Sequence, residues 1–157
     1  MAASPQERPA PSLPVGWSSR PIAASDFESG ALTLLSQLTH VGVVDRATFE
    51  QQIASMAACG IVTLVVCDTS GTVRGMASLL VEPKLIHGCG KVGHIEDVVV
   101  DAACRGQRLG EWLIAELCRV AARSGCYKTI LDCDDKNAGF YEKCGFKRKG
   151  VEMRFDH

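Results

Sequence analysis

The spacing of apolar and polar residues along the chain predicts short helices and strands in a mixed order. Apolar runs rich in β-branched residues, at 61–67, 73–81 and 91–100, are separated by turn residues and predict an antiparallel meander. Apolar residues at helical spacing predict helices that span about 25–39, 45–60, 106–124 and 137–145. Shorter strands are expected at 17–22, 127–131 and 146–155.

The order of these elements predicts the topology of the sheet. The strand at 91–100, the helix at 106–124 and the strand at 127–131 form a βαβ unit, whose right-handed crossover makes the two strands parallel. We therefore expect an α/β fold of the α+β type. Its mixed central sheet is antiparallel in the N-terminal half and parallel in the βαβ half, with helices on both faces.

Length and composition predict one domain preceded by a tail. A chain of 157 residues can bury a core of its own, and we assign residues 15–157 to a single domain. Residues 1–14 are rich in Ala, Pro and Ser, so we expect a mobile tail outside that core.

Charge and hydropathy argue against several classes of partner. The formal net charge is −1, which gives no support for a nucleic-acid partner. No apolar run approaches the roughly 20 residues that span a bilayer, and the N-terminus does not resemble a signal peptide. We expect no membrane partner and a cytoplasmic location, with organelle targeting left open. The 8 cysteines form no C-x-x-C pair and the 4 histidines are scattered, so we expect reduced thiols and no metal.

The turn between the third long strand and the following helix is the first candidate site. Its sequence is Arg105-Gly106-Gln107-Arg108-Leu109-Gly110. Free backbone N–H groups and the helix dipole at a helix start favour an anion, and the two arginines add positive charge. A pyrophosphate cradle and an ordinary solvated turn fit this stretch equally well. A P-loop does not fit, because no Lys-Ser or Lys-Thr follows.

Further motifs on both sides of this turn carry a family resemblance. The turn resembles the form Q/R-x-x-G-x-G/A, with Arg108 in place of its first glycine. H-I-E-D-V precedes the turn at 94–98, while G-C-Y-K and F-Y-E-K-C-G-F follow at 125–128 and 140–146. The chain resembles the GCN5-related N-acetyltransferases (GNAT) over roughly residues 17–155, and in particular the members that acetylate glucosamine 6-phosphate. The resemblance implies the GNAT fold, acetyl-CoA as co-substrate, glucosamine 6-phosphate as acceptor and no metal. It also implies a role in UDP-N-acetylglucosamine biosynthesis and a homodimer with composite active sites.

The resemblance also assigns residues to roles. The implied catalytic residues are Glu96, Asp97, Tyr141 and Asp132, the last supplied across a dimer interface. The implied cofactor-binding residues are Val98, Val99, Val100, Arg105, Gly106, Gln107, Arg108, Leu109, Gly110, Asn137 and Tyr141. The implied substrate-binding residues are Thr39, Lys84, Leu85, Ile86, His87, Glu96, Asp97, Tyr127, Lys128, Asp132 and Arg154, the last in a shifted position.

The chemistry of acetyl transfer explains why such residues are needed. A thioester is already activated, so the enzyme must orient a neutral amine, bind an oxyanion and help a thiolate leave. A bulge at 97–99 would free backbone N–H groups, and without one Glu96 and Asp97 would face opposite sides of the strand. The phenol of Tyr141 can donate a proton to sulfur.

Several alternatives stay open at this point. Either carboxylate could act as the base, directly or through water. The acceptor could be a peptide or polyamine amine on the same fold, and a non-enzymatic acyl-CoA-binding domain is a further possibility.

Overall fold

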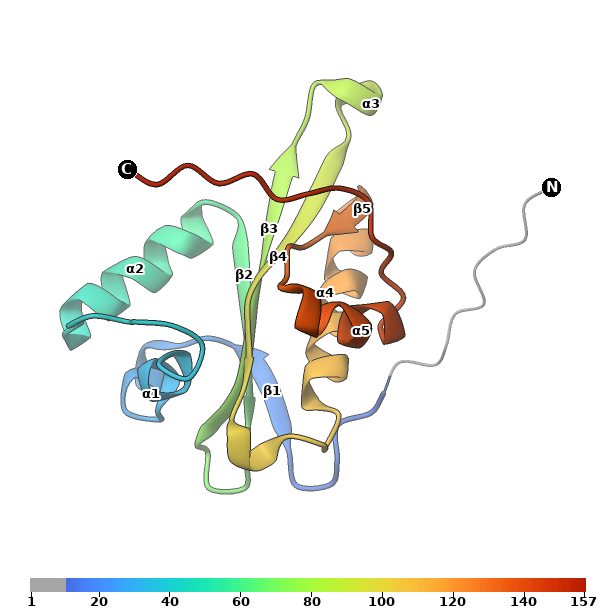
Figure 1. The fold of residues 1–157 in the computed structure, drawn as a ribbon. Coiled ribbons are helices and arrows are strands. Elements are labelled where there is room, and N and C mark those ends of the chain that lie inside the picture. Colours follow the sequence, from blue (N-terminus) through green and yellow to red (C-terminus); the bar gives the residue numbers. More distant parts are fainter. Residues whose placement is uncertain (1–10) are drawn as a thin grey trace.

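A computed structural model describes residues 11–157 and is built around a five-stranded sheet (Figure 1). The strands are β1 (Ser18–Pro21), β2 (Ile61–Cys67), β3 (Val73–Pro83), β4 (Lys91–Val100) and β5 (Cys126–Ile130). They lie in this order across the sheet, antiparallel from β1 to β4, while β4 and β5 are parallel. The predicted mixed sheet is therefore confirmed. Residues 1–10 of the expected tail lie outside the described part, and Leu13 packs against the core.

Helices cover both faces of this sheet, as predicted (Figure 1). They are α1 (Ala31–Leu35), α2 (Arg46–Ala58), α3 (Ile86–Cys89), α4 (Leu109–Arg123) and α5 (Asp135–Lys143), with the 3-10 turns η1 (Ala24–Phe27) and η2 (Ala102–Cys104). Helices α1 and α2 lie on one side, and α4 and α5 on the other. No helix within residues 11–157 combines the length and the hydropathy that a membrane crossing needs.

Helix α4 supplies the main apolar contact to the sheet. Its buried side chains recur at helical spacing and pack against β3 and β4: Leu109, Leu113, Ile114, Leu117 and Ala121. The helix begins at Leu109 and not at Gly106, because Arg108 adopts a left-handed conformation with φ 62° and stands at the N-cap. The N-terminus of α4 therefore lies at Leu109, shortly after the end of β4 at Val100.

The single helix predicted over about 25–39 is wrong. The structure has the short η1 and α1 instead, separated by Gly30 with φ 95°. A left-handed glycine interrupts helical geometry, so the apolar periodicity continues across the break while the helix does not. The turn after α1 is thereby free to reach the end of β4.

The strand predicted over 146–155 is also wrong. This segment has no regular secondary structure, and its alternating apolar residues Val151, Met153 and Phe155 are 86%, 89% and 82% exposed. A strand exists only through hydrogen bonds to a neighbouring edge. In Figure 1 the C-terminal segment runs past β3 and β4 and is not a strand of the sheet, so its β pattern has no partner strand within residues 11–157. Arg154 pairs with Asp156 inside this exposed segment.

An ion pair between Arg20 and Asp26 links β1 to η1. The Asp26 side chain is fully buried, and its oxygens accept hydrogen bonds from Arg20 Nη1 and Nη2 at 2.7 and 2.6 Å and from the Ala23 N–H at 2.8 Å. The buried carboxylate is therefore fully compensated, while Arg20 remains partly exposed.

We expect Arg20→Met to lower the free energy of unfolding by about 2 kcal/mol, because it leaves a buried carboxylate without its cation. Urea unfolding followed by circular dichroism measures the change. Arg46→Met is the matched control, since the pairs of Arg46 with Glu28 and Glu50 are half exposed and contribute little. Equal stability of the Arg20→Met protein and the parent would contradict this assignment.

Candidate active site

A bulge in β4 shapes the candidate site. Ser78 on β3 lies opposite Glu96, but Met76 lies opposite Val99, so β4 has one residue more than β3 over this stretch. Asp97 has φ 52°, a rare value for a residue other than glycine. The predicted bulge is confirmed. It leaves backbone groups of β4 without a ladder partner and changes the direction of the Asp97 side chain relative to that of Glu96.

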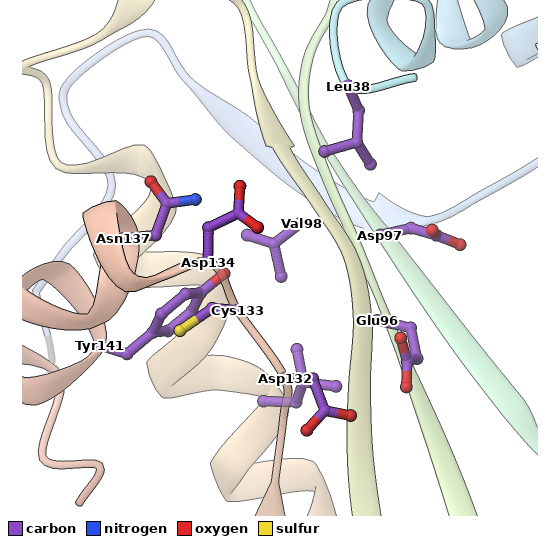
Figure 2. A pocket seen from close by; sticks show the side chains of 10 residues that line it. Leu38, Glu96, Asp97, Val98, Asp132, Cys133, Asp134, Asn137 and Tyr141 are labelled. Carbon is purple, nitrogen blue, oxygen red and sulfur yellow. The ribbon is translucent and has the colours of Figure 1, made fainter. Parts of the chain in front are cut away.

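Just beyond the paired part of β4 and β5, the sheet opens. The parallel register runs from Lys91 opposite Cys126 to His94 opposite Ile130 and then stops. A pocket of about 240 Å³ lies where β4 separates from the segment that follows β5 (Figure 2). Its lining residues come from β4, the segment after β5, α5 and the turn after α1: Leu38, Ile95, Glu96, Asp97, Val98, Asp132, Cys133, Asp134, Asn137 and Tyr141.

Six of the residues named from the sequence meet in this pocket. They are Glu96, Asp97, Val98, Asp132, Asn137 and Tyr141. Figure 2 shows the Tyr141 hydroxyl pointing from α5 toward β4. Asp132 lies in the same pocket as Glu96 of its own chain, so a single subunit already brings these two carboxylates together.

The sequence reasoning missed four lining residues. Ile95 and Cys133 are direct neighbours of residues that it named, and Asp134 is two residues from Asp132, so closeness in the chain was a usable signal. Leu38, in the turn after α1, is the neighbour of Thr39, which was named, but Thr39 itself lies outside the pocket lining, so adjacency did not point to the pocket. Gln37 fastens this turn to the end of β4, since its side-chain oxygen accepts a hydrogen bond from the Ala102 N–H at 2.9 Å. Only the tertiary structure places Leu38 over the bulge.

Several of the named substrate residues lie elsewhere. The end of the β3–β4 hairpin carries α3, where the ring centroids of His87 and Tyr127 are 4.3 Å apart and Lys128 Nζ is 5.6 Å from the Tyr127 centroid. Lys84 is paired with Glu82. Thr39, Leu85, Ile86 and Arg154 also lie outside the pocket lining. The structure thus groups most of the basic candidates on the hairpin and not around the pocket carboxylates.

The turn from Arg105 to Gly110 leads into the N-terminus of α4, where backbone N–H groups have no partner within the helix. Gly106 has φ 82°, a conformation that favours glycine, while Arg108 pairs with Glu111 at 2.7 Å. The Trp112 N–H binds the Arg108 carbonyl, so the N–H groups before it have no partner within the helix. A Cβ at Gly110 would lie 3.1 Å from Phe140 Cζ, so this glycine lets α4 and α5 approach closely. The geometry supports an anion at this helix start.

Partial desolvation and like charges act on the Glu96 carboxylate, which lines the pocket and stays exposed to solvent. The pKa of Glu96 is raised, first by desolvation and then by the negative charges of Asp97 and Asp132, whereas His94 acts in the opposite direction. A carboxylate with a raised pKa is a better proton acceptor than an ordinary one.

Tyr141 lies on α5, on the side of the pocket opposite to β4. Burial raises the pKa of its phenol, so Tyr141 keeps its proton at neutral pH. Its ring is held between Phe140 and Phe146 at centroid distances of 5.0 and 6.2 Å. The pocket therefore combines a proton acceptor on β4 with a proton donor on α5.

The model of the Acetyltransferase (GNAT) family matches residues 32–146. The chain belongs to the GNAT family. A glucosamine 6-phosphate N-acetyltransferase of Candida albicans is 42% identical over 143 residues, which cover 90% of this chain and 96% of the relative. Solved structures agree. The glucosamine-6-phosphate N-acetyltransferase of Arabidopsis thaliana has a TM-score of 0.87 at 38% identity, covering 89% of this chain and 97% of the other. An acetyltransferase of Trypanosoma brucei has a TM-score of 0.85 at 41% identity, covering 90% and 99%.

The family assignment agrees with the GNAT fold and the acetyltransferase activity expected from the sequence motifs. The family match includes β4, the turn before α4 and all of the pocket lining. Within the part of the chain that the structure describes, no group of three or more His, Cys, Asp or Glu side chains is arranged to hold a metal ion.

We expect Asp132→Asn to lower the pKa of Glu96, because it removes a like charge that disfavours the ionised carboxylate. Carbon-detected NMR of the Glu96 carboxyl, followed as a function of pH, measures the change. Asp134→Asn is the control, since Asp134 lines the same pocket but pairs with Lys136 and does not contribute to the shift of Glu96. An unchanged Glu96 titration in the Asp132→Asn protein would contradict the like-charge explanation.

Proposed function

We propose that this GNAT protein transfers the acetyl group of acetyl-CoA directly to the 2-amino group of D-glucosamine 6-phosphate, giving N-acetyl-D-glucosamine 6-phosphate and CoA. The product enters UDP-N-acetylglucosamine biosynthesis. Relatives named for this activity match nearly the whole chain at about 40% identity and support the acceptor. The observation that carries the chemistry is the pocket at the bulge, where Glu96 and Tyr141 come from opposite walls.

Acetyl-CoA binds along the opening between β4 and α5. Its pyrophosphate occupies the start of α4, where the N–H groups after Arg108 and the positive end of the helix dipole favour an anion. The pantetheine arm follows the free edge of β4, using backbone groups released around the bulge. This path brings the thioester to Val98, between Glu96 and Tyr141.

The reaction needs no covalent intermediate on the protein. Glu96 takes a proton from the ammonium group, directly or through one water, and the neutral amine attacks the thioester carbon. Backbone N–H groups at the bulge bind the oxyanion of the tetrahedral intermediate. When the carbon–sulfur bond breaks, the Tyr141 phenol donates its proton to the departing sulfur. The attacking nitrogen loses its second proton through solvent as the amide forms, which restores the phenol, and Glu96 releases the first proton to solvent.

The acceptor phosphate needs cations, which the pocket itself does not supply. Lys84, His87 and Lys128 lie on or beside the β3–β4 hairpin, outside the pocket lining of their own chain. A second subunit offers a way to join the two groups. We therefore include in the proposal a homodimer in which the basic residues of one chain complete the site of the other.

Two unpartnered features support the homodimer. The C-terminal residues Val151, Met153 and Phe155 alternate with polar residues along the sequence, and all three are exposed. Strand β5 is an edge strand, and its Tyr127 and Ile130 are 40% and 37% exposed. An unpaired edge and an unpaired β pattern in one chain are suited to pairing between two copies.

A second candidate acceptor is favoured by the charge of the pocket. Glu96, Asp97, Asp132 and Asp134 line it together, with no Lys or Arg among the lining residues. A carboxylate-lined pocket suits a polyamine, which carries several positive charges and no phosphate.

We expect rapid release of free CoA thiol with glucosamine 6-phosphate and at least about a hundredfold lower kcat/KM with unphosphorylated glucosamine, because the sugar phosphate contributes charge-assisted binding. Colorimetric thiol detection, run beside spermidine and a peptide amine, measures this. Turnover of spermidine alone would replace the phosphosugar by the polyamine. Binding of acetyl-CoA without turnover of any amine would reject the enzyme.

The same assay isolates the role of Tyr141. Tyr141→Phe keeps the ring between Phe140 and Phe146 but removes the proton donor, so kcat should fall by about a hundredfold with little change in KM for either substrate. An unchanged kcat would remove Tyr141 from the chemical step.

The dimer has its own test. We expect light scattering after size-exclusion chromatography to give twice the 16.8 kDa chain mass for the parent. The triple variant Val151→Ser, Met153→Ser, Phe155→Ser should shift toward monomer, because it removes the exposed apolar face of the C-terminal segment. Its circular dichroism spectrum should stay unchanged, since these side chains are exposed in the single chain. A monomeric parent would contradict the dimer.

A further inference from the structure

The backbone at the end of the β3–β4 hairpin has an unusual conformation. His87, Gly88 and Cys89 are all left-handed, with φ values of 53°, 66° and 58°. This region is unfavourable for residues other than glycine, and a run of it persists only where surrounding contacts hold the chain. Figure 1 shows this segment, labelled α3, at the far end of the hairpin, beyond the other strands.

The core does not hold this turn. Residues 85–90 are called the hairpin turn below, and residues 85–89 are all exposed, including the apolar Leu85 and Ile86 at 92% and 61%. Two backbone hydrogen bonds close the turn. The Lys84 N–H donates to the Gly90 carbonyl at 2.8 Å, and the Gly90 N–H donates to the Ile86 carbonyl at 3.2 Å. Both bonds lie within the hairpin, so they do not attach the turn to the rest of the sheet.

An aromatic contact supplies that attachment. The ring centroids of His87 and Tyr127 are 4.3 Å apart, with an angle of 39° between the ring planes. Tyr127 belongs to β5, whose pairing with β4 begins at Lys91, so its ring reaches the hairpin turn from the neighbouring strand. Aromatic pairs at this distance are favourable beyond the area that they bury. The stack therefore holds the left-handed turn against β5.

Gly90 makes room for the Tyr127 ring. A Cβ at position 90 would lie 2.9 Å from Tyr127 Cδ1, 3.3 Å from Tyr127 Cε1 and 3.1 Å from the His87 carbonyl oxygen. Carbon atoms in a protein do not approach as closely as the first of these distances unless one of them moves. Gly90 itself has φ −71° and ψ −178°, an extended conformation that any residue can adopt. Space for the ring, and not backbone freedom, therefore requires a glycine here.

The same ring lies among the basic side chains of the hairpin. Lys128 Nζ is 5.6 Å from the Tyr127 centroid, within the range of a cation–π contact. The backbone of Lys84 is bound to Gly90, and the His87 ring stacks on Tyr127. These three basic residues thus share one support, and a displaced Tyr127 ring would change the arrangement of all of them.

We propose that Gly90 is a positioning residue for the acceptor site: by leaving space for the Tyr127 ring, it holds the hairpin turn so that Lys84, His87 and Lys128 bind the sugar phosphate in the pocket of the other subunit. This role rests on the acceptor and the dimer proposed above. Gly90 touches no reacting atom. It acts on the binding of the phosphate and not on the chemical step.

Gly90→Ala tests this role with a single methyl group, which should push the Tyr127 ring away from His87. We expect kcat/KM for glucosamine 6-phosphate to fall about tenfold, the scale of one weakened charge-assisted hydrogen bond. The loss should appear in KM, with kcat and the KM for acetyl-CoA within about twofold of the parent, because only acceptor binding is affected. The kcat/KM for unphosphorylated glucosamine should also stay within about twofold of the parent, since that sugar has no phosphate to bind.

Gly139→Ala is the matched control. Gly139 is an exposed glycine of α5, and a Cβ added there would meet no atom within 4 Å. The same change of side chain is therefore made without displacing a neighbour. All kinetic constants of this variant should match those of the parent.

A double-mutant cycle identifies the Tyr127 ring as the group through which Gly90 acts. Tyr127→Ala removes the ring and should raise the KM for glucosamine 6-phosphate. In the Tyr127→Ala background, Gly90→Ala should raise it by a further factor of about two or less, because the ring that the methyl group displaces is already gone.

The stack and the binding step can both be measured without turnover. The ring current of Tyr127 shifts the NMR resonances of the His87 ring C–H groups. These resonances should move in Gly90→Ala and in Tyr127→Ala and keep their parental positions in Gly139→Ala. Calorimetric titration of CoA-saturated protein with glucosamine 6-phosphate should give a Kd about tenfold higher for Gly90→Ala than for the parent.

The outcomes separate this inference from the proposed function. Unmoved His87 resonances in Gly90→Ala, fully additive losses in the double variant, or an equal loss of kcat/KM with unphosphorylated glucosamine would overturn the role of Gly90. A parent that binds glucosamine 6-phosphate more tightly than Gly90→Ala does, but does not acetylate it, would reject the proposed reaction and support the inference. A parent that does not bind glucosamine 6-phosphate would overturn both.

Discussion

The backbone pairing of β4 sets the conditions for everything else in this structure. Strand β4 is paired on both edges at His94, but its contact with β5 ends there, and its contact with β3 is interrupted by the bulge at Asp97 and Val98. A strand in the middle of a sheet normally has all its peptide groups satisfied by its neighbours. Here a few of them are released at one place, and the pocket forms at that place.

The opening between β4 and the chain after β5 keeps its shape because packed elements lie on both faces of the sheet. Helix α4 buries five apolar side chains against the sheet, and Gly110 lets α5 approach α4 closely through Phe140. On the other side, Gln37 attaches the turn after α1 to the end of β4. A separation of two strands within such a packed frame gives a defined pocket, since the walls cannot collapse together.

Electrostatics then divide the pocket into two functional walls. The β4 wall carries Glu96, whose pKa is raised by burial and neighbouring carboxylates and is lowered by His94. The α5 wall carries Tyr141, whose phenol stays protonated because it is buried. A proton acceptor and a proton donor on opposite walls are the arrangement that direct transfer from a thioester to an amine requires.

The sequence by itself determined the sheet order, the βαβ unit and the motifs around residues 94–98, 105–110 and 137–146, because these depend on local periodicity and on residues close together in the chain. It also indicated the bulge, through two adjacent acids that both needed to face a site. Only the tertiary structure placed Leu38 in the pocket, divided the first helix at Gly30, and left the C-terminal segment unpaired. These depend on contacts between distant segments and on whether a partner edge is present. The pattern of side chains in a segment indicates whether it favours a helix or a strand, but the tertiary structure determines which other segment it pairs with.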